Sequence, residues 1–338
     1  MSEVIYLIGA GASYGERNTD QYGHIVPGSI KRGMPVVNEL EIAINRYRNT
    51  IAEPDSFGSP SESSKYAYIY QELKWLEDMC KTYPTIDTYA KMLSVTGQVG
   101  LLDRLKNALS IFFALIQNHD NRDLRYDGFI AAIIQDLCEL PSNVSILSWN
   151  YDFQVEYVLQ DFYFEHGSLL HTWQNRGISC KGCCSNINVN KSNIIKLNGT
   201  AMFSQSRNHE LIDPDDCSID VLEKHLSKED KSWYSNISFA WEKDDNFIES
   251  ILPIVYDAEV LVVIGYSFPY VNRFVDRKII HNMDNLMSVY IQDAHPNDVR
   301  QSFDAVLSDD QKRQVRENQI SIYQRDSLRQ FIIPSELE

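Results

Sequence analysis

The stretch VIYLIGAGASYG, from Val4 to Gly15, is a short apolar run that ends in a glycine turn. A continuous apolar run such as Val4 to Ile8, closed by Gly9, is typical of a strand buried on both faces of a parallel sheet. Similar runs return at Val144–Leu147, Asn193–Leu197, Glu259–Ile264 and Met287–Ile291. Helical patterns lie between or after these runs. Strands alternating with helices predict an α/β fold with a doubly wound, mostly parallel, Rossmann-like sheet.

One long segment departs from this alternation. From about Ser61 to Leu140, apolar residues recur at three- and four-residue spacing, which is typical of amphipathic helices. The pattern predicts an inserted helical lobe over residues 61–140. The sheet domain then comprises residues 1–60 and 141–338. The tail Gln319–Ile332 fits one last strand and a short helix.

Composition restricts the possible partners. The 338 residues carry a formal net charge of −16 with a pI near 4.9, which argues against direct contact with nucleic acid or an anionic membrane surface. The chain has no run of about 18 apolar residues, so we expect no membrane-spanning helix. The first residues lack the basic and apolar regions of a signal peptide. The six cysteines form no regular framework, so we expect a reducing, cytoplasmic location.

The first glycine turn suggests a phosphate site. Gly9 and Gly11 would let the main chain approach a pyrophosphate, and the helix that follows would supply amide donors. The dinucleotide fingerprint of dehydrogenases requires a further glycine where this chain has Tyr14, and no strand ending in an acidic residue follows within about 20 residues. A long polar loop, Gly23–Pro35, is predicted there instead. A hydride-transferring enzyme is therefore disfavoured, and a tight turn without a ligand stays open.

Three later segments place polar residues after predicted strands. SWNYD contains Asn150 and Asp152, IKLNGT contains Asn198, and LVVIGYSF contains Gly265 and Ser267. Ligands of open α/β sheets collect beyond the carboxyl ends of the strands. Each segment alone is equally consistent with an Asx turn, a helix cap or a simple turn.

Taken in order, GAGAS, G-x-P…EL, IDTYA, NYD, KL-x-G and IGYSF resemble the SIR2-like family. The resemblance is closer to bacterial NAD-consuming SIR2-like effectors of antiphage defence than to the protein deacylases. It implies a SIR2-like form of the Rossmann-like domain, with NAD as the substrate. The residues that it assigns to the NAD pyrophosphate are Gly9, Ala10, Gly11, Ala12 and Ser13.

The resemblance also assigns the remaining positions of the site. Asn150 and Asp152 would lie beside the nicotinamide ribose and amide. Gly265 and Ser267 would close over phosphate and ribose. Asp293, at the end of VYIQD, would reach the adenosine ribose.

Position 198 departs from the family. The usual sequence is K-L-H-G, whose histidine acts as the catalytic base, whereas this chain has Asn198. An amide cannot accept a proton as imidazole does. The chain is therefore a catalytically inactive NAD binder, or it uses another base such as Asp152, His166 or His171, or Asn198 is an inactivating substitution. The third interpretation is favoured, since the change from histidine to asparagine keeps polarity and approximate size.

A zinc site is disfavoured. Cys180 and Cys183 form one C-x-x-C pair, followed by Cys184, while Cys217 lies far away. A structural zinc ion requires four ligands, which His209 or His225 would have to complete. We therefore predict no metal and reduced thiols. The lack of a second C-x-x-C pair also weakens a deacylase interpretation.

The resemblance implies an NAD+ hydrolase that releases nicotinamide and ADP-ribose, serves antiphage defence by NAD depletion and is impaired by Asn198. The alternative is an inactive NAD or ADP-ribose sensor, or a regulatory subunit. About 45 residues follow Asp293, too few for a further sensor domain. We therefore expect control by a separate sensor or activator subunit, or by assembly into an oligomer.

Overall fold

The computed structural model of the chain describes residues 3–54, 60–61, 65–117, 119–134, 139–162, 168–175, 178–181, 187–188, 191–205, 210–227, 232–242 and 245–337. Its centre is a seven-stranded sheet in the order β14-β13-β12-β1-β6-β8-β7. The strands are β1 (Glu3–Ile8), β6 (Val144–Ser148), β7 (Ile178–Cys180), β8 (Asn193–Lys196), β12 (Ala258–Ile264), β13 (Ser288–Gln292) and β14 (Ser321–Arg325). All six neighbouring pairs in this sheet are parallel. The predicted doubly wound, Rossmann-like sheet is confirmed.

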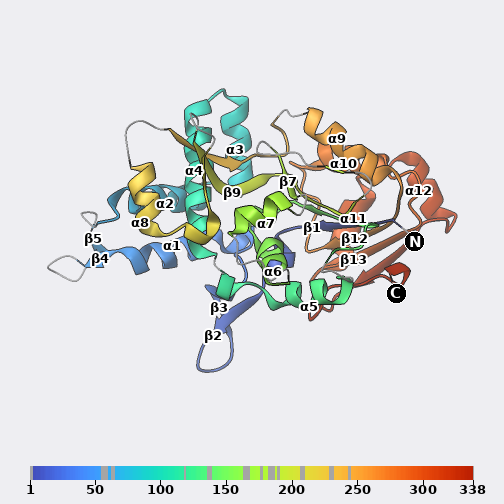
Figure 1. Cartoon of the computed structure of the whole chain (residues 1–338), viewed down its shortest axis with the longest axis horizontal. Helices are drawn as coiled ribbons and strands as arrows, with labels where there is room; N and C mark the ends of the chain where they lie inside the picture. The colour runs from blue at the N-terminus through green and yellow to red at the C-terminus, as the bar shows by residue number, and fades with distance from the viewer. Residues whose placement is uncertain are drawn as a thin grey trace.

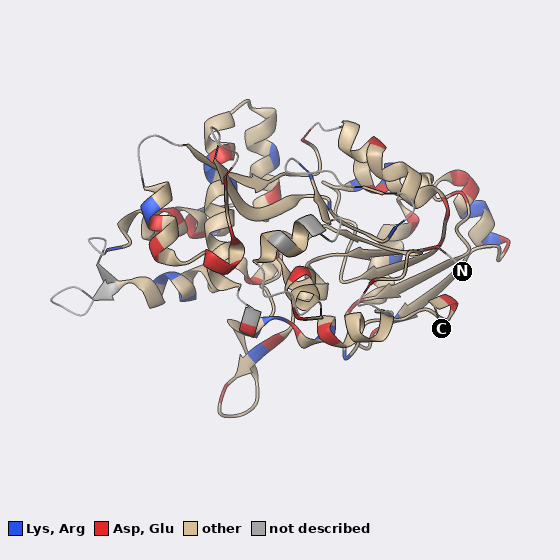
Figure 2. Cartoon of the chain, viewed as in Figure 1, with Lys and Arg blue, Asp and Glu red and all other residues tan. Residues whose placement is uncertain are grey.

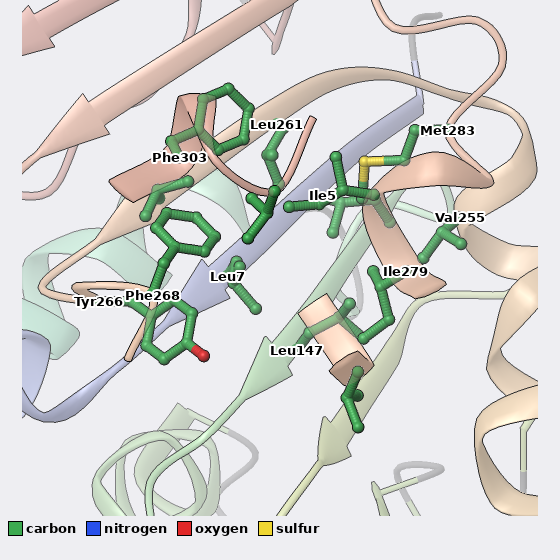
Figure 3. Close-up of a cluster of buried hydrophobic side chains, with 14 of the residues drawn as sticks. Ile5, Leu7, Leu147, Val255, Leu261, Tyr266, Phe268, Ile279, Met283 and Phe303 are labelled. Atoms are coloured by element: carbon green, nitrogen blue, oxygen red, sulfur yellow. The ribbon is translucent and has the colours of Figure 1, made fainter. Parts of the chain in front are cut away.

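Helices cover both faces of the sheet, because successive side chains of each strand point to opposite faces. In β1, Ile5 and Leu7 face α9 (Asp245–Tyr256), α10 (Arg273–His281), α11 (Pro296–Asp304) and α12 (Asp309–Arg316). Figure 3 shows this first cluster. The alternate residues Val4, Tyr6 and Ile8 face α5 (Leu124–Ile133), α6 (Gln154–Phe162) and α7 (Leu169–Asn175). Burial of β1 on both faces explains its unbroken apolar sequence.

A second module lies beside the sheet. It contains α1 (Leu40–Ile51), α2 (Ala67–Thr82), α3 (Ile86–Val95), α4 (Val99–Ile116) and α8 (Ile219–Leu226). A three-stranded antiparallel sheet joins them, in the order β10 (Leu211–Ile212), β9 (Gly199–Gln205), β11 (Trp233–Ile237). Figure 1 shows this module on the left and the parallel sheet on the right.

The hydrophobic core of the second module extends beyond the predicted insertion at 61–140. Leu40, Ala43 and Ile44 of α1 belong to it, as do Phe203 of β9 and Ile237 of β11. The apolar side chains of α5 instead pack on the parallel sheet. Residues on both sides of the inserted segment therefore complete the helical core, because the three amphipathic helices α2, α3 and α4 alone leave apolar surface that other elements must cover.

Two local predictions differ from the structure. The polar stretch after the first turn forms an antiparallel hairpin, β2 (Glu16–Thr19) and β3 (Ile25–Arg32), which projects at the bottom of Figure 1. The predicted short helix after the last strand is wrong, since the described residues after β14 contain no α-helix and only the 3-10 turn η6 (Ser335–Leu337). A further short pair, β4 (Glu53–Pro54) and β5 (Pro60–Ser61), follows α1.

The surface carries charges of both signs on its outer helices. Acidic and basic residues lie side by side along α12, as Figure 2 shows. Among the helices of the described ranges, none combines the length and hydropathy needed to cross a bilayer.

Candidate active site

The sheet has a topological switch point at β1. The chain leaves β1 towards β6 on one side, whereas the neighbouring strand β12 continues to β13 on the other. Ligands of open α/β sheets bind in the crevice that this reversal creates at the carboxyl ends of the strands. A cavity of about 510 Å³ lies there. Its lining comes from residues within 34–40, 85–88, 149–152 and 265–272, together with Gly9, Ala10, Leu109, Phe113 and Asn198.

Most of the predicted site residues meet at this cavity. The predicted residues that line it are Gly9, Ala10, Asn150, Asp152, Asn198, Gly265 and Ser267. They follow four different strands of one parallel sheet, and their convergence explains why segments far apart in sequence lie together. The other predicted residues, Gly11, Ala12, Ser13 and Asp293, do not line the cavity.

The two glycine turns pack against each other. A Cβ at Gly9 would lie 2.7 Å from the carbonyl oxygen of Gly265, and the Gly11 amide donates to that oxygen at 2.9 Å. Gly265 has a φ of +59°, and a Cβ there would lie 2.2 Å from the Ala12 nitrogen. These glycines therefore have a structural reason besides ligand approach, since only residues without a side chain allow the two turns this close.

Ser13 positions Asn150. The Asn150 Nδ2 donates to the Gly9 carbonyl at 3.0 Å and to the Ser13 Oγ at 3.0 Å. The Ser13 hydroxyl also bonds the Tyr126 hydroxyl at 3.0 Å, and Ser13 is fully buried. Because both amide hydrogens are used inside the protein, the Asn150 Oδ1 is the atom left for a ligand. Ser13 thus orients Asn150 without lining the cavity itself.

Asp152 is held by a buried ionic cluster. The Lys196 ammonium lies 3.2 Å from Glu156 and donates to the Asp152 carbonyl at 2.5 Å, and both Lys196 and Glu156 are 1% exposed. Burial raises the pKa of the Asp152 carboxyl, while the Lys196 charge and a bond from Ser13 oppose that rise. The Gln154 amide donates to Asp152 Oδ1 at 3.3 Å. Asp152 is therefore a fixed carboxyl at the cavity wall.

Asn198 sits on a tight turn between β8 and β9. The Asn198 carbonyl accepts a bond from the Ser238 amide at 2.7 Å. The next residue, Gly199, has a φ of +69°, and a Cβ there would lie 1.9 Å from the Asn236 carbonyl oxygen. This crowding explains the glycine after position 198 and fixes where the side chain at that position points.

The Asn198 amide has one unsatisfied atom. Its Nδ2 donates weakly to the Trp149 carbonyl at 3.4 Å, which fixes the amide orientation, and its buried Oδ1 has no hydrogen-bond partner within the described structure. An orphaned buried acceptor costs about 1–3 kcal/mol.

Asp293 has a different local role. It follows β13, and its Oδ1 accepts a bond from the His295 amide at 2.9 Å ahead of helix α11. The structure therefore places it in a turn rather than in the cavity wall. Gly265 and Ser267 both remain open to the cavity, and Ser267 is exposed.

Two groups of lining residues lacked an assigned role in the sequence. Trp149 and Tyr266 stack with centroids 5.7 Å apart and planes at 15°, and the Tyr266 hydroxyl donates to the buried Asp276 carboxyl at 2.9 Å. Asp87 lies in the first turn of α3, and burial raises its pKa to about 6. Asp87 belongs to the IDTYA segment. The only sequence feature that pointed to this residue was the position of IDTYA in the ordered set of motifs.

The remaining candidate ligands lie largely elsewhere. Cys183, Cys184, His166 and His209 fall outside the described residues, and so does the side chain of His171. Cys180 is disulfide-bonded, so its interpretation as a reduced thiol is wrong. Within the described ranges, no group of three or more His, Cys, Asp or Glu side chains is arranged to hold a metal.

A larger cavity, of about 800 Å³, lies between α2, α4, α8 and β11. None of the residues predicted to bind NAD lines it, although His225, a candidate zinc ligand, does. Two of its basic residues are paired, Arg104 with Glu72 at 2.9 Å and Lys106 with Glu242 at 2.5 Å. The smaller cavity at the switch point is the better candidate site, because polar side chains from the ends of three strands, β6, β8 and β12, converge there.

Comparison with known proteins gives distant structural similarity only. No protein-family model matches the sequence, and no curated protein matches it. A sirtuin solved in work on sirtuin substrate affinity is 13% identical, with a TM-score of 0.37 over 96% of this chain and 89% of that one. A SIR2 protein in complex with an inhibitor, 2′-O-acetyl-ADP-ribose and a deacetylated peptide is 12% identical, with a TM-score of 0.38 over 94% of each chain. At these values the similarity does not assign the chain to a family.

Proposed function

We propose that the chain binds NAD+ in the switch-point cavity and hydrolyses its nicotinamide N-glycosidic bond, at a rate limited by Asn198. The observation that carries this proposal is the convergence of Asn150, Asp152 and Asn198 on one cavity beside the two glycine turns. These are the positions that the SIR2-like sequence resemblance assigns to NAD. The volume of about 510 Å³ is within the usual range of small-ligand sites.

The lining chemistry suits the nicotinamide end of NAD+. Asp87 and Asp152 contribute carboxyls, Trp149 and Tyr266 contribute stacked rings, and the described lining contains no lysine, arginine or histidine. A positively charged pyridinium ring is favoured by carboxylates and by aromatic faces. Ala10 and Ser267, which are both exposed and line the cavity, offer main chain and a hydroxyl to the phosphates.

The reaction breaks the bond between the ribose C1′ and the nicotinamide nitrogen, and the electron pair leaves with neutral nicotinamide. Water then bonds to C1′ and loses a proton, so ADP-ribose and a proton are the other products. The free Asn150 Oδ1 accepts a hydrogen bond from the ribose or from this water. Asn198 lines the cavity, but its amide side chain cannot remove the proton of a ribose hydroxyl.

We propose antiphage defence by NAD depletion as the biological role, on the strength of the SIR2-like resemblance. An NAD-depleting enzyme that is always active would harm its own cell. Control therefore belongs to a separate sensor or activator subunit, or to assembly into an oligomer. The test is NAD+ hydrolysis by the isolated Asn198→His protein. Full activity without a partner would contradict external control.

The second candidate function is a sensor that binds NAD or ADP-ribose without chemistry. The observation that favours it is the absence of histidine from the described cavity lining. Calorimetric binding of NAD+ together with chromatographic measurement of nicotinamide release separates the two functions. Binding without release, even with histidine at position 198 and candidate partners present, would favour the sensor.

A further inference from the structure

We propose that Asp87 selects a positively charged ligand ring, so that the cavity binds the oxidised nicotinamide of NAD+ in preference to the neutral ring of NADH. This inference rests on the proposed function and deepens it by naming a specificity residue. Asp87 belongs to the IDTYA segment, to which no role in the site was assigned.

The backbone fixes Asp87 at the cavity. Thr85 caps helix α3, and its Oγ1 accepts a bond from the Thr88 amide at 3.1 Å. Thr85, Asp87 and Thr88 all line the cavity. Burial raises the pKa of the hydroxyls of Tyr151, after β6, and Tyr266, after β12, and the Asp87 charge adds to that rise in both. Asp87 therefore lines the same cavity as the residues at the strand ends and is within electrostatic reach of both tyrosines.

No cation of the described structure neutralises Asp87. No side chain of the described ranges forms a hydrogen bond or an ion pair with its carboxylate. Lys91, one helical turn later, lies over the Trp241 ring at 5.1 Å, and Arg104 of the adjacent helix α4 pairs with Glu72. An unpaired carboxylate in a partly enclosed cavity is costly, and a bound cation lowers that cost.

The other titratable groups considered at the cavity are either neutral or already have a partner, so Asp87 is the carboxylate left to interact with a bound cation. Burial and neighbouring carboxylates raise the pKa values of Tyr151 and Tyr266 well above those of free tyrosine, so both hydroxyls stay neutral near pH 7. Asp152 is tied to Lys196 and Ser13. Helices α2 and α4, which pack on α3, place no titratable side chain in the described lining.

The experiment compares two ligands that differ in ring charge. Carba-NAD+ keeps the pyridinium but resists hydrolysis, and NADH has a neutral dihydropyridine. Isothermal titration gives both Kd values at pH 8 and pH 5. For the unmodified protein at pH 8 we expect carba-NAD+ to bind about tenfold more tightly than NADH, as one charge pair of this kind provides. Asp87→Asn should remove that preference, and Asp87→Glu should retain part of it.

Lower pH provides a second, independent readout. Burial places the pKa of Asp87 at about 6, so the preference of the unmodified protein should fall between pH 8 and pH 5. Asp78→Asn, on the exposed surface of α2, is the matched control and should behave as the unmodified protein. Thermal unfolding establishes that each variant is folded.

Two results overturn the inference in distinguishable ways. If carba-NAD+ binds but its preference over NADH is the same with Asp87→Asn, the role of Asp87 is wrong and the proposed function stands. If neither ligand binds at millimolar concentration, both proposals fall. Should Asp87→Asn fail to fold, a preference in the unmodified protein that does not change between pH 8 and pH 5 overturns the inference.

Discussion

Replacing Asn198 with histidine should convert a binding site into an active one. The Asn198 Nδ2 already donates to the Trp149 carbonyl at 3.4 Å. One ring N–H of a histidine can make the same bond, which directs the other nitrogen, an acceptor, into the cavity. The orphaned Asn198 Oδ1 would be replaced by a base that can remove a ribose hydroxyl proton.

The expected gain follows from general-base catalysis. A positioned base contributes about 10²- to 10⁴-fold, which corresponds to about 2.7–5.4 kcal/mol of transition-state stabilisation. The rate should rise with pH and level off above about 6.5, the ordinary pKa of histidine, because only neutral imidazole accepts the proton. The assay is chromatographic release of nicotinamide at saturating NAD+, with and without candidate partner proteins.

Two controls isolate the base. Asn198→Gln enlarges the side chain but keeps an amide, so it should give no gain. Asn150→Ala, combined with Asn198→His, removes the ligand-facing oxygen and should return the rate to background. The reasoning is refuted if Asn198→His binds NAD+ yet releases no more nicotinamide than Asn198→Gln. The sensor function would then be preferred.

Three further changes test the packing and charges around the cavity. Gly265→Ala would place a Cβ 2.2 Å from the Ala12 nitrogen at a positive φ. We therefore expect the free energy of unfolding, measured in urea, to fall by more than about 3 kcal/mol, and a fall of less than about 1 kcal/mol would contradict this expectation. Lys196→Met leaves Glu156 buried and unpaired, which should lower the free energy of unfolding by about 3–5 kcal/mol. Adding Glu156→Gln should recover part of that loss, and purely additive losses in the double variant would argue against the ion pair. Asp87 has a folded pKa of about 6, above that of an unfolded aspartate, so its stabilising contribution is present at low pH and is lost as pH rises through 6. Asp87→Asn should therefore raise the melting temperature at pH 8 relative to the unmodified protein and change it little at pH 4, and an equal shift at both pH values would speak against a titrating Asp87.

The sequence was sufficient for six of the seven strands of the parallel sheet, and it missed the short edge strand β7. Strands such as β1 and β12 are buried on both faces, and burial on both faces leaves an unbroken apolar run that can be recognised without coordinates. The same reasoning located the polar residues after the strands, because the carboxyl ends of parallel strands share one edge. Asn150 and Asn198 were therefore predicted to be neighbours, and they line one cavity.

The sequence was less informative about the second module. Residues 61–140 were predicted as one helical lobe, whereas its core also includes Leu40 of α1 and Phe203 of β9, while Phe129 of α5 packs on the parallel sheet. Helical periodicity shows which face of a helix is buried but not what covers it. Contacts between distant segments decide that, and no local pattern records them.

The sequence by itself determined the order of the strands along the chain, the glycine turns and the missing histidine at position 198, because each depends on residue type and local spacing. Tertiary structure alone decided that Gly9 and Ala10 line the cavity, whereas Gly11, Ala12 and Ser13 do not. It alone brought Asp87, from a helix of the second module, to the same cavity as the residues at the strand ends. Both outcomes depend on how distant segments pack together, and packing is a property of surfaces assembled from residues that are far apart in the chain.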